Sequence, residues 1–149
     1  MAGRKPLPPT YFNLSILLIF ASHFLIRFII LVSFPYNIIG VLPFLAGIYL
    51  NLAADKDFKI ADTTVKPFEK SKVLLKTGVF SITRNPMYLG MFLILIGVSI
   101  LLGSLIPFIV SIVYAVLMDK IFIGAEESML EDTFADEWIE YKKKVRRWI

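Results

Sequence analysis

Apolar residues gather along this chain in long stretches that are separated by short segments rich in charge. The first stretch, 14–34, is 21 residues long, and its only ionisable side chains are His23 and Arg27. The second stretch, 38–54, carries no charged residue. Because a helix of about 20 apolar residues crosses the hydrocarbon layer of a bilayer, we predict a transmembrane helix over each stretch. The first helix is expected to be retained in the mature protein.

The third apolar stretch is too long for a single crossing. No charged residue lies between Arg84 and Asp119, a run of 34 residues. One helix of that length would measure about 50 Å, against about 30 Å for the hydrocarbon layer. A glycine followed by a serine at 103–104 favours a turn near the middle of the run. The pattern therefore predicts a tight hairpin of two further helices, 86–102 and 105–123.

From residue 125 onwards, apolar positions recur every three or four residues, which is the spacing of one face of an α-helix. These positions are Leu130, Phe134, Trp138, Tyr141, Val145 and Trp148. Acidic residues come first in this tail and basic residues last, the order that suits the helix dipole. We predict an amphipathic cytosolic helix over 125–148 whose basic end fits an anionic lipid surface.

Together these stretches predict an all-α fold, a polytopic membrane protein with four transmembrane helices and a C-terminal amphipathic helix in a single membrane domain over 1–149. Basic residues lie before the first helix and within the 55–85 loop, whereas the two opposite loops have none. Cytoplasmic loops of membrane proteins carry the excess of Lys and Arg. We therefore expect a multi-pass protein whose N-terminus, C-terminus and 55–85 loop are cytoplasmic.

Composition excludes several classes of function. Of the 149 residues, 57% are hydrophobic and 19% charged, which is unlike an ordinary soluble domain. The chain has no cysteine and one histidine, so thiolate or multi-histidine metal sites and cysteine nucleophiles are excluded, and no metal is expected. The net charge is +4, and the basic residues lie in the segments predicted to be cytoplasmic. This excess of positive charge is therefore attributed to membrane orientation, and no nucleic-acid partner is expected.

The stretch Arg84-Asn85-Pro86-Met87-Tyr88-Leu89-Gly90 carries the strongest candidate chemistry. Asn85 is a favourable N-cap and Pro86 a favourable first residue, so a helix is predicted to begin there at the membrane surface. Its free N–H groups, together with Arg84, form a site for a carboxylate or phosphate, and Tyr88 adds a hydroxyl. In the alternative interpretation, Arg84 marks the membrane border and Asn-Pro only caps a helix.

Two further features have both a functional and a structural interpretation. Glu126 and Glu127 are able to bind hydroxyl or ammonium groups and to accept a proton, but they also suit the first turn of a helix. Small residues at Gly90, Gly97 and Ser104 predict close helix packing, with access for a flat ligand as the alternative.

The first predicted helix contains two ionisable side chains, His23 and Arg27, which are four residues apart and share one face. An arginine inside the membrane requires a partner or a water-lined cavity. The alternative is that its side chain extends to the non-cytoplasmic interface.

Taken in order, these pieces resemble the superfamily of isoprenylcysteine carboxyl methyltransferases and phospholipid methyltransferases, which are membrane enzymes. The residues that carry the resemblance are Thr63-Thr64-Val65-Lys66-Pro67, Leu75-Lys76-Thr77-Gly78-Val79-Phe80, Arg84 to Gly90, Glu126-Glu127, Phe134-Ala135-Asp136-Glu137-Trp138 and Tyr141. The match covers about the C-terminal 90 residues. Asn85 stands where the eukaryotic carboxyl methyltransferases have His, and Ala135 and Trp138 replace Gly and Tyr of the family tail.

The resemblance implies that S-adenosylmethionine binds between the last transmembrane helices and the C-terminal segment, and that a lipid-like acceptor arrives from the bilayer. It implies that Arg84 and Glu127 take part in catalysis, and that Tyr141 and Arg147 contact the substrate. The residues that it implies for cofactor binding are Gly78, Arg84, Asn85, Pro86, Tyr88, Gly90, Glu126 and Glu127.

The expected function is an integral membrane methyltransferase that transfers the sulfonium methyl group by direct displacement onto a lipid-like or amphipathic acceptor. An amine acceptor requires loss of a proton, for which the Glu126-Glu127 pair is the candidate base. The chain has no Gly-x-Gly-x-x-Gly loop, which argues against a soluble Rossmann-type methyltransferase. Two alternatives remain open: an NADPH-dependent membrane reductase of the steroid reductase-like group, and a non-catalytic lipid-binding scaffold.

Overall fold

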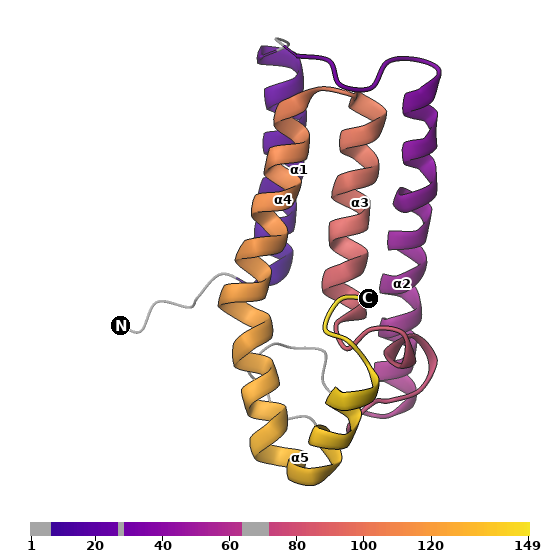
Figure 1. Cartoon of the computed structure of the whole chain (residues 1–149), viewed down its shortest axis with the longest axis vertical. Helices are drawn as coiled ribbons and strands as arrows, with labels where there is room; N and C mark the ends of the chain where they lie inside the picture. Colours follow the sequence, from indigo (N-terminus) through magenta and orange to yellow (C-terminus); the bar gives the residue numbers. More distant parts are fainter. Residues whose placement is uncertain (1–6, 27–28, 64–71) are drawn as a thin grey trace.

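Four long helices run alongside one another, and the chain ends in a segment that folds back onto one end of them (Figure 1). The computed structural model describes residues 7–26, 29–63 and 72–149. The helices of the described part are α1 (Pro8–Leu25), η1 (Tyr36–Gly40), α2 (Val41–Ile60), η2 (Gly78–Ser81), α3 (Pro86–Leu102), α4 (Leu105–Met118), η3 (Asp119–Ile123) and α5 (Gly124–Lys144). The described residues form no β-strand, in agreement with the all-α prediction.

Helix α3 lies at the centre of this arrangement and packs on α2, on α4 and, less extensively, on α1. Its packing against α2 depends on glycines that face each other across the pair. A Cβ atom on Gly97 would lie 2.6 Å from the backbone nitrogen of Phe44 and 2.7 Å from the carbonyl oxygen of Gly40. Such distances are too short for any side chain, so the predicted close packing of the glycine face is present in the structure.

The first helix differs from the one predicted over 14–34, because α1 covers Pro8–Leu25. Prolines at its first two positions suit a helix start. Beyond α1, the backbone N–H groups of Leu31 and Val32 donate to the carbonyl of Gly103 at 2.7 and 3.1 Å. Those bonds to the turn between α3 and α4 take the place of helical ones, so the apolar run is not a single helix.

The second helix also extends past its prediction of 38–54, which had placed its end at the first charge. Helix α2 continues to Ile60, and Lys59 pairs with Asp55 one turn earlier on its exposed surface. The first charged residue indicates where the membrane segment ends. The helix itself need not end at the bilayer surface. Helix α3 covers the predicted range, and Gly103 closes it at φ 72°.

The fourth helix does not end before the tail. Helix α4 passes through the π-helical turn η3 directly into α5, so the chain is helical from Leu105 to Lys144. Its direction changes at Ala135, whose backbone has φ 42° and ψ −116°. The amphipathic helix predicted over 125–148 therefore differs from α5, which ends at Lys144 and has a kink at Ala135.

The apolar face of α5 packs inward. Trp138, Tyr141 and Val145 are buried in a cluster with Leu74 of the 72–77 segment. Trp148, which the sequence pattern placed on the same face, lies beyond the helix and packs edge-on against Phe92 of α3.

In the described part of the chain, two helices are long and apolar enough to cross a membrane: Tyr36–Ile60, which joins η1 to α2, and Leu105–Lys144. Helix α3 is apolar but shorter. Arg27, the Arg4-Lys5 pair, residues 64–67 and Lys70 lie outside the described residues.

Candidate active site

The candidate residues meet where the N-terminus of α3, the start of α5 and the C-terminal segment 145–149 come together (Figure 1). Arg84 and Glu127 form an ion pair of 3.1 Å between Nη2 and Oε1, and their side chains are only 8% and 7% exposed. The guanidinium of Arg84 also lies 5.5 Å from the ring centre of Trp138. Two opposite charges removed from water in this way hold each other in a fixed place.

Arg147 contacts the other side of the same carboxylate. Its Nη2 lies 2.6 Å from Oε2 of Glu127, and its Nη1 lies 3.1 Å from Oδ1 of Asp119 in η3. Trp148 donates from Nε1 to the same oxygen of Asp119 at 3.2 Å. The C-terminal segment thereby fixes Glu127, which in turn holds Arg84.

Backbone carbonyls of this segment bind the residues just before α3. The N–H of Arg84 donates to the carbonyl of Arg146 at 3.0 Å. The carbonyl of Arg147 accepts from Thr83 Oγ1 at 3.1 Å and from Asn85 Nδ2 at 3.0 Å. Asn85 therefore stands at the predicted N-cap position, but its side chain makes no capping bond to α3. It ties the C-terminal segment to the helix start.

A second pair, a buried tyrosine and a half-buried glutamate, lies on the cavity side of α5. Tyr88 donates from its hydroxyl to Oε1 of Glu126 at 2.7 Å. Burial raises the pKa of the Glu126 carboxyl to about 7, and the hydrogen bond from Tyr88 opposes that shift. A carboxyl group with such a pKa exchanges a proton close to neutral pH, which suits a group that binds a cation or accepts a proton.

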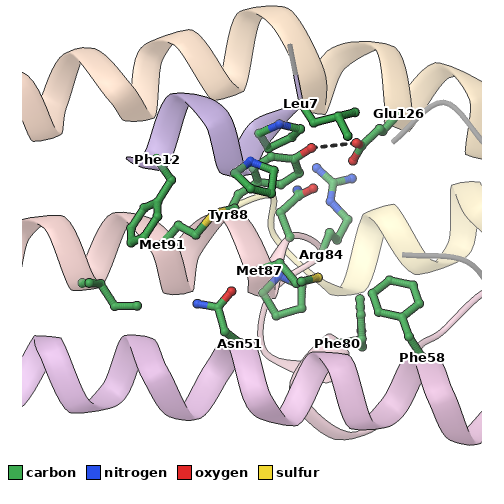
Figure 2. Close-up of a pocket in the computed structure, with 15 residues that line it drawn as sticks. Leu7, Phe12, Asn51, Phe58, Phe80, Arg84, Met87, Tyr88, Met91 and Glu126 are labelled. Carbon is green, nitrogen blue, oxygen red and sulfur yellow. Dashed lines mark hydrogen bonds between the residues drawn. The ribbon is translucent and has the colours of Figure 1, made fainter. Parts of the chain in front are cut away.

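These two pairs border a cavity of about 470 Å³ (Figure 2). Its polar lining comes from Arg84, Asn85, Tyr88, Glu126 and Asn51, and the rest is apolar. The apolar residues are Leu7, Pro8, Pro9, Phe12, Phe58, Phe80, Pro86, Met87, Met91 and Ile94. The cavity combines a charged end with an apolar wall and has the size of a small-molecule site.

Arg84, which lines this cavity, has hydrogen-bonding capacity that its neighbours do not use. Its Nε and Nη1 atoms are buried and have no hydrogen-bond partner within the described residues. Buried donors are nearly always satisfied, and those of a guanidinium match a carboxylate. An amino-acid carboxylate such as that of S-adenosylmethionine therefore fits the donors that Arg84 leaves free.

The structure brings most of the predicted site residues together. Arg84, Asn85, Pro86, Tyr88 and Glu126 line the cavity, while Glu127 lies behind Arg84. Four others do not line it: Gly78, Gly90, Tyr141 and Arg147.

Each of those four has an evident structural contact instead. Gly78 has a positive φ of 60° beside the carboxylate of Asp57, and Gly90 faces α2. Tyr141 is buried and donates to the carbonyl of Phe80 at 2.6 Å. Burial raises the pKa of the Tyr141 hydroxyl to about 12, so it remains a donor.

The sequence pattern did not indicate the α1 and α2 walls of the cavity. Phe12 and Phe58 resemble any other apolar residue of a membrane helix, so the sequence carries no signal for them. Asn51 does carry a signal, because the stretch 38–54 contains no other Asn and no Gln, Ser or Thr. An isolated polar residue in such a stretch marks a candidate functional position.

Comparison with known proteins shows the family and the fold of this chain. The sequence model of the phospholipid methyltransferase family matches residues 35–137. The fold is similar to that of the eukaryotic intramembrane Ras methyltransferase, isoprenylcysteine carboxyl methyltransferase, with a TM-score of 0.64 and 24% identity. That likeness covers 95% of this chain and 51% of the solved one.

Two proteins from other organisms are similar to part of this chain in sequence. The protein-S-isoprenylcysteine O-methyltransferase of Saccharomyces cerevisiae is 40% identical over 79 residues, which are 52% of this chain and 32% of the yeast protein. An uncharacterized protein of Haemophilus influenzae is 38% identical over 63 residues, 42% of this chain and the whole of that protein. This chain thus spans about a third of the yeast enzyme and belongs to the phospholipid methyltransferase family of membrane proteins.

Proposed function

We propose that this protein is an integral membrane methyltransferase that uses S-adenosylmethionine and acts on a lipid-like or amphipathic acceptor, as isoprenylcysteine carboxyl methyltransferases do. One observation carries the proposal most directly. Arg84 has two nitrogens without a hydrogen-bond partner in the described part of the chain, and it lines a cavity together with the Tyr88–Glu126 pair and an apolar wall. A cofactor with a carboxylate and a positive centre fits the charged end, and an acyl or prenyl chain fits the apolar wall.

We further propose that four helical spans cross the bilayer, with 105–123 as the membrane part of the last helix, and that both chain ends face the cytoplasm. The charged end of the cavity then lies at the cytoplasmic membrane border, since α3 begins there at Pro86. Exposed basic residues on α5 and on the 72–76 segment lie at the same end, in accord with the positive-inside rule. Membrane lipids are the expected partners.

When bound, S-adenosylmethionine would supply a methyl group on a positively charged sulfur, which the acceptor's nucleophile would take as the sulfur–carbon bond breaks and S-adenosylhomocysteine leaves, with no covalent intermediate on the protein. In our account, Arg84 binds the carboxylate end through the donors it leaves free. Glu127 and Arg147 hold Arg84 in place, and the carboxylate of Glu126 favours nearby positive charge. The apolar wall excludes water and orients the acceptor, effects that are worth several kcal/mol of barrier.

Glu126 is also positioned to take a proton from an acceptor that needs to lose one. Its pKa of about 7 is close to the pH at which a general base works best. An amine or hydroxyl acceptor would use this capacity, whereas a carboxylate acceptor is already ionised and would not.

Calorimetric binding to the purified protein in detergent tests the proposal. We expect S-adenosylmethionine and S-adenosylhomocysteine to bind in the micromolar range and NADPH not to bind. Arg84→Ala should abolish that binding, while Arg146→Ala should leave it unchanged, because the Arg146 side chain is exposed and only its carbonyl contacts Arg84. Binding of NADPH alone would support the reductase alternative, and binding of neither would support the scaffold.

A further inference from the structure

The wall of the cavity formed by α2 contains one polar side chain, Asn51, which the sequence motifs do not include. It extends from α2 toward α3, on the opposite side of the cavity from Glu126 (Figure 2). In Figure 2 it lies away from Arg84 and Glu126, which form the charged end of the cavity. An amide at this depth of a membrane protein is unfavourable unless it has a polar partner.

One hydrogen bond fixes how the amide is turned. Its Nδ2 donates to the carbonyl of Gly47, one turn earlier in α2, at 2.9 Å. Because a carbonyl is able only to accept, the nitrogen must face Gly47 and the oxygen Oδ1 is left for the cavity. Within the described part of the chain, Oδ1 has no hydrogen-bond donor.

Gly90 of α3 provides the space for this orientation. A Cβ atom at Gly90 would collide with Nδ2 of Asn51 and would lie 2.8 Å from the carbonyl oxygen of Gly47. The glycine of the Arg-Asn-Pro-x-Tyr-x-Gly motif therefore makes room for the Asn51 amide in this protein. The motif glycine and the α2 asparagine together present one hydrogen-bond acceptor to the cavity.

We propose that Asn51 is a specificity-determining residue that accepts a hydrogen bond from an N–H or O–H group of the methyl acceptor, and so disfavours acceptors that lack such a donor. The proposal rests on the proposed function for its choice of ligand. Once the acceptor has displaced water from the apolar wall, a donor on it satisfies Oδ1, whereas an ether or a carboxylate leaves it unpaired. Leaving a buried acceptor unpaired is the usual physical basis of rejection at such sites.

Two uncharged probes that differ in one donor test this assignment: oleyl alcohol and its methyl ether. Both are titrated into the protein saturated with S-adenosylhomocysteine, so that no methyl transfer takes place. We expect the alcohol to bind about tenfold more tightly than the ether to the natural protein. Asn51→Leu, which is close in volume, should make the two probes bind alike without changing the affinity for S-adenosylhomocysteine.

Asn37→Leu is the matched control, because Asn37 donates to the Leu101 carbonyl near the end of α3 that is remote from the cavity. It should keep the tenfold preference. If Asn51→Leu does not fold, Asn51→Ala takes its place. Equal binding of both probes to the natural protein, a preference that survives in Asn51→Leu, or a parallel loss of S-adenosylhomocysteine binding would each overturn the assignment. Failure of S-adenosylhomocysteine to bind any form contradicts the proposed function instead, and the probes then test Asn51 alone.

Discussion

At the scale of single residues, Glu127 is the side chain that holds the charged part of the site together. Its carboxylate, 7% exposed, lies between two guanidinium groups, with Arg84 at 3.1 Å and Arg147 at 2.6 Å. Removing one member of a buried ion pair leaves the other charge without compensation. Arg84 is almost as buried as Glu127, so it has no access to bulk water as a substitute.

We therefore expect Glu127→Gln to destabilise the protein by about 3 kcal/mol and to weaken S-adenosylmethionine binding by releasing Arg84. Thermal unfolding in detergent measures the first effect and calorimetry the second. Glu137→Gln is the control, since Glu137 pairs with Lys76 at 2.7 Å on the exposed surface. That pair should be worth at most about 1 kcal/mol. Equal effects of the two substitutions would contradict the role assigned to Glu127.

The raised pKa of Glu126 predicts how stability depends on pH. The folded state holds the proton up to a pH of about 7, whereas the unfolded state releases it near 4.5. The folded state thus binds more protons between these values, and stability falls as pH rises from about 4.5 through about 7. Unfolding measured from pH 5 to pH 8 should show this loss in the natural protein and less of it in Glu126→Gln. A loss of the same size in both would show that other groups cause it.

At the scale of elements, Ala135 produces the reversal that brings the C-terminal segment back to α3. Its φ of 42° lies in the left-handed region, which costs a residue with a Cβ atom about 1 kcal/mol or more. The family tail has glycine at this position, the residue for which such a φ is least unfavourable. Ala135 therefore adopts a conformation that suits the family residue better than its own.

Ala135→Gly should accordingly stabilise the protein by about 1 kcal/mol. Ala125→Gly is the matched control, because Ala125 is exposed in the same helix and has ordinary helical geometry. It should destabilise by about 0.5–1 kcal/mol. Chemical unfolding of both variants measures the two signs, and destabilisation by both would contradict the conformation of Ala135.

The elements that the sequence pattern predicted correctly are those whose ends carry local signals. Helix α3 begins at a proline and ends before a glycine, and its range was predictable from those two residues. The end of α1 was not, because it depends on hydrogen bonds from 31–32 to the distant turn at Gly103. The reversal at Ala135 was not predicted either, although the missing family glycine was a signal for it.

The site divides in the same way. Arg84, Tyr88 and Glu126 were predictable because they lie in short motifs with recognisable chemistry, and the structure places them around one cavity. The role of Arg147 follows from its reach to Glu127, a contact between residues 20 apart that no local pattern contains. The α1 and α2 walls depend on helix packing and leave no local mark except the isolated Asn51.

At the scale of the whole molecule, the cavity lies between α1 and α2 and against α3, at one end of the bundle. The segment 119–147, which is rich in charged residues, lies at that end. The opposite end holds the uncharged turns at 36–40 and 103–104 (Figure 1). With the proposed topology, this polarity would place the proposed cofactor site at one membrane surface, next to an apolar wall.

The proposed orientation can be checked because the chain has no cysteine of its own. We expect Lys143→Cys to react with a membrane-impermeant maleimide only from the cytoplasmic side. Tyr36→Cys, at the opposite end and 76% exposed in the natural residue, should react only from the other side. Labelling of both positions from the same side would contradict the four-span topology.

Photolabelling tests whether S-adenosylmethionine binds at the cavity bordered by Arg84 and Glu126, as we propose. Purified protein is irradiated with methyl-labelled S-adenosylmethionine, and the labelled peptides are identified by mass spectrometry. Our account predicts label within 84–91 or at 126–127, competed away by S-adenosylhomocysteine and absent in Arg84→Ala. Competed label confined to other parts of the chain, or the same labelling in Arg84→Ala, would contradict it.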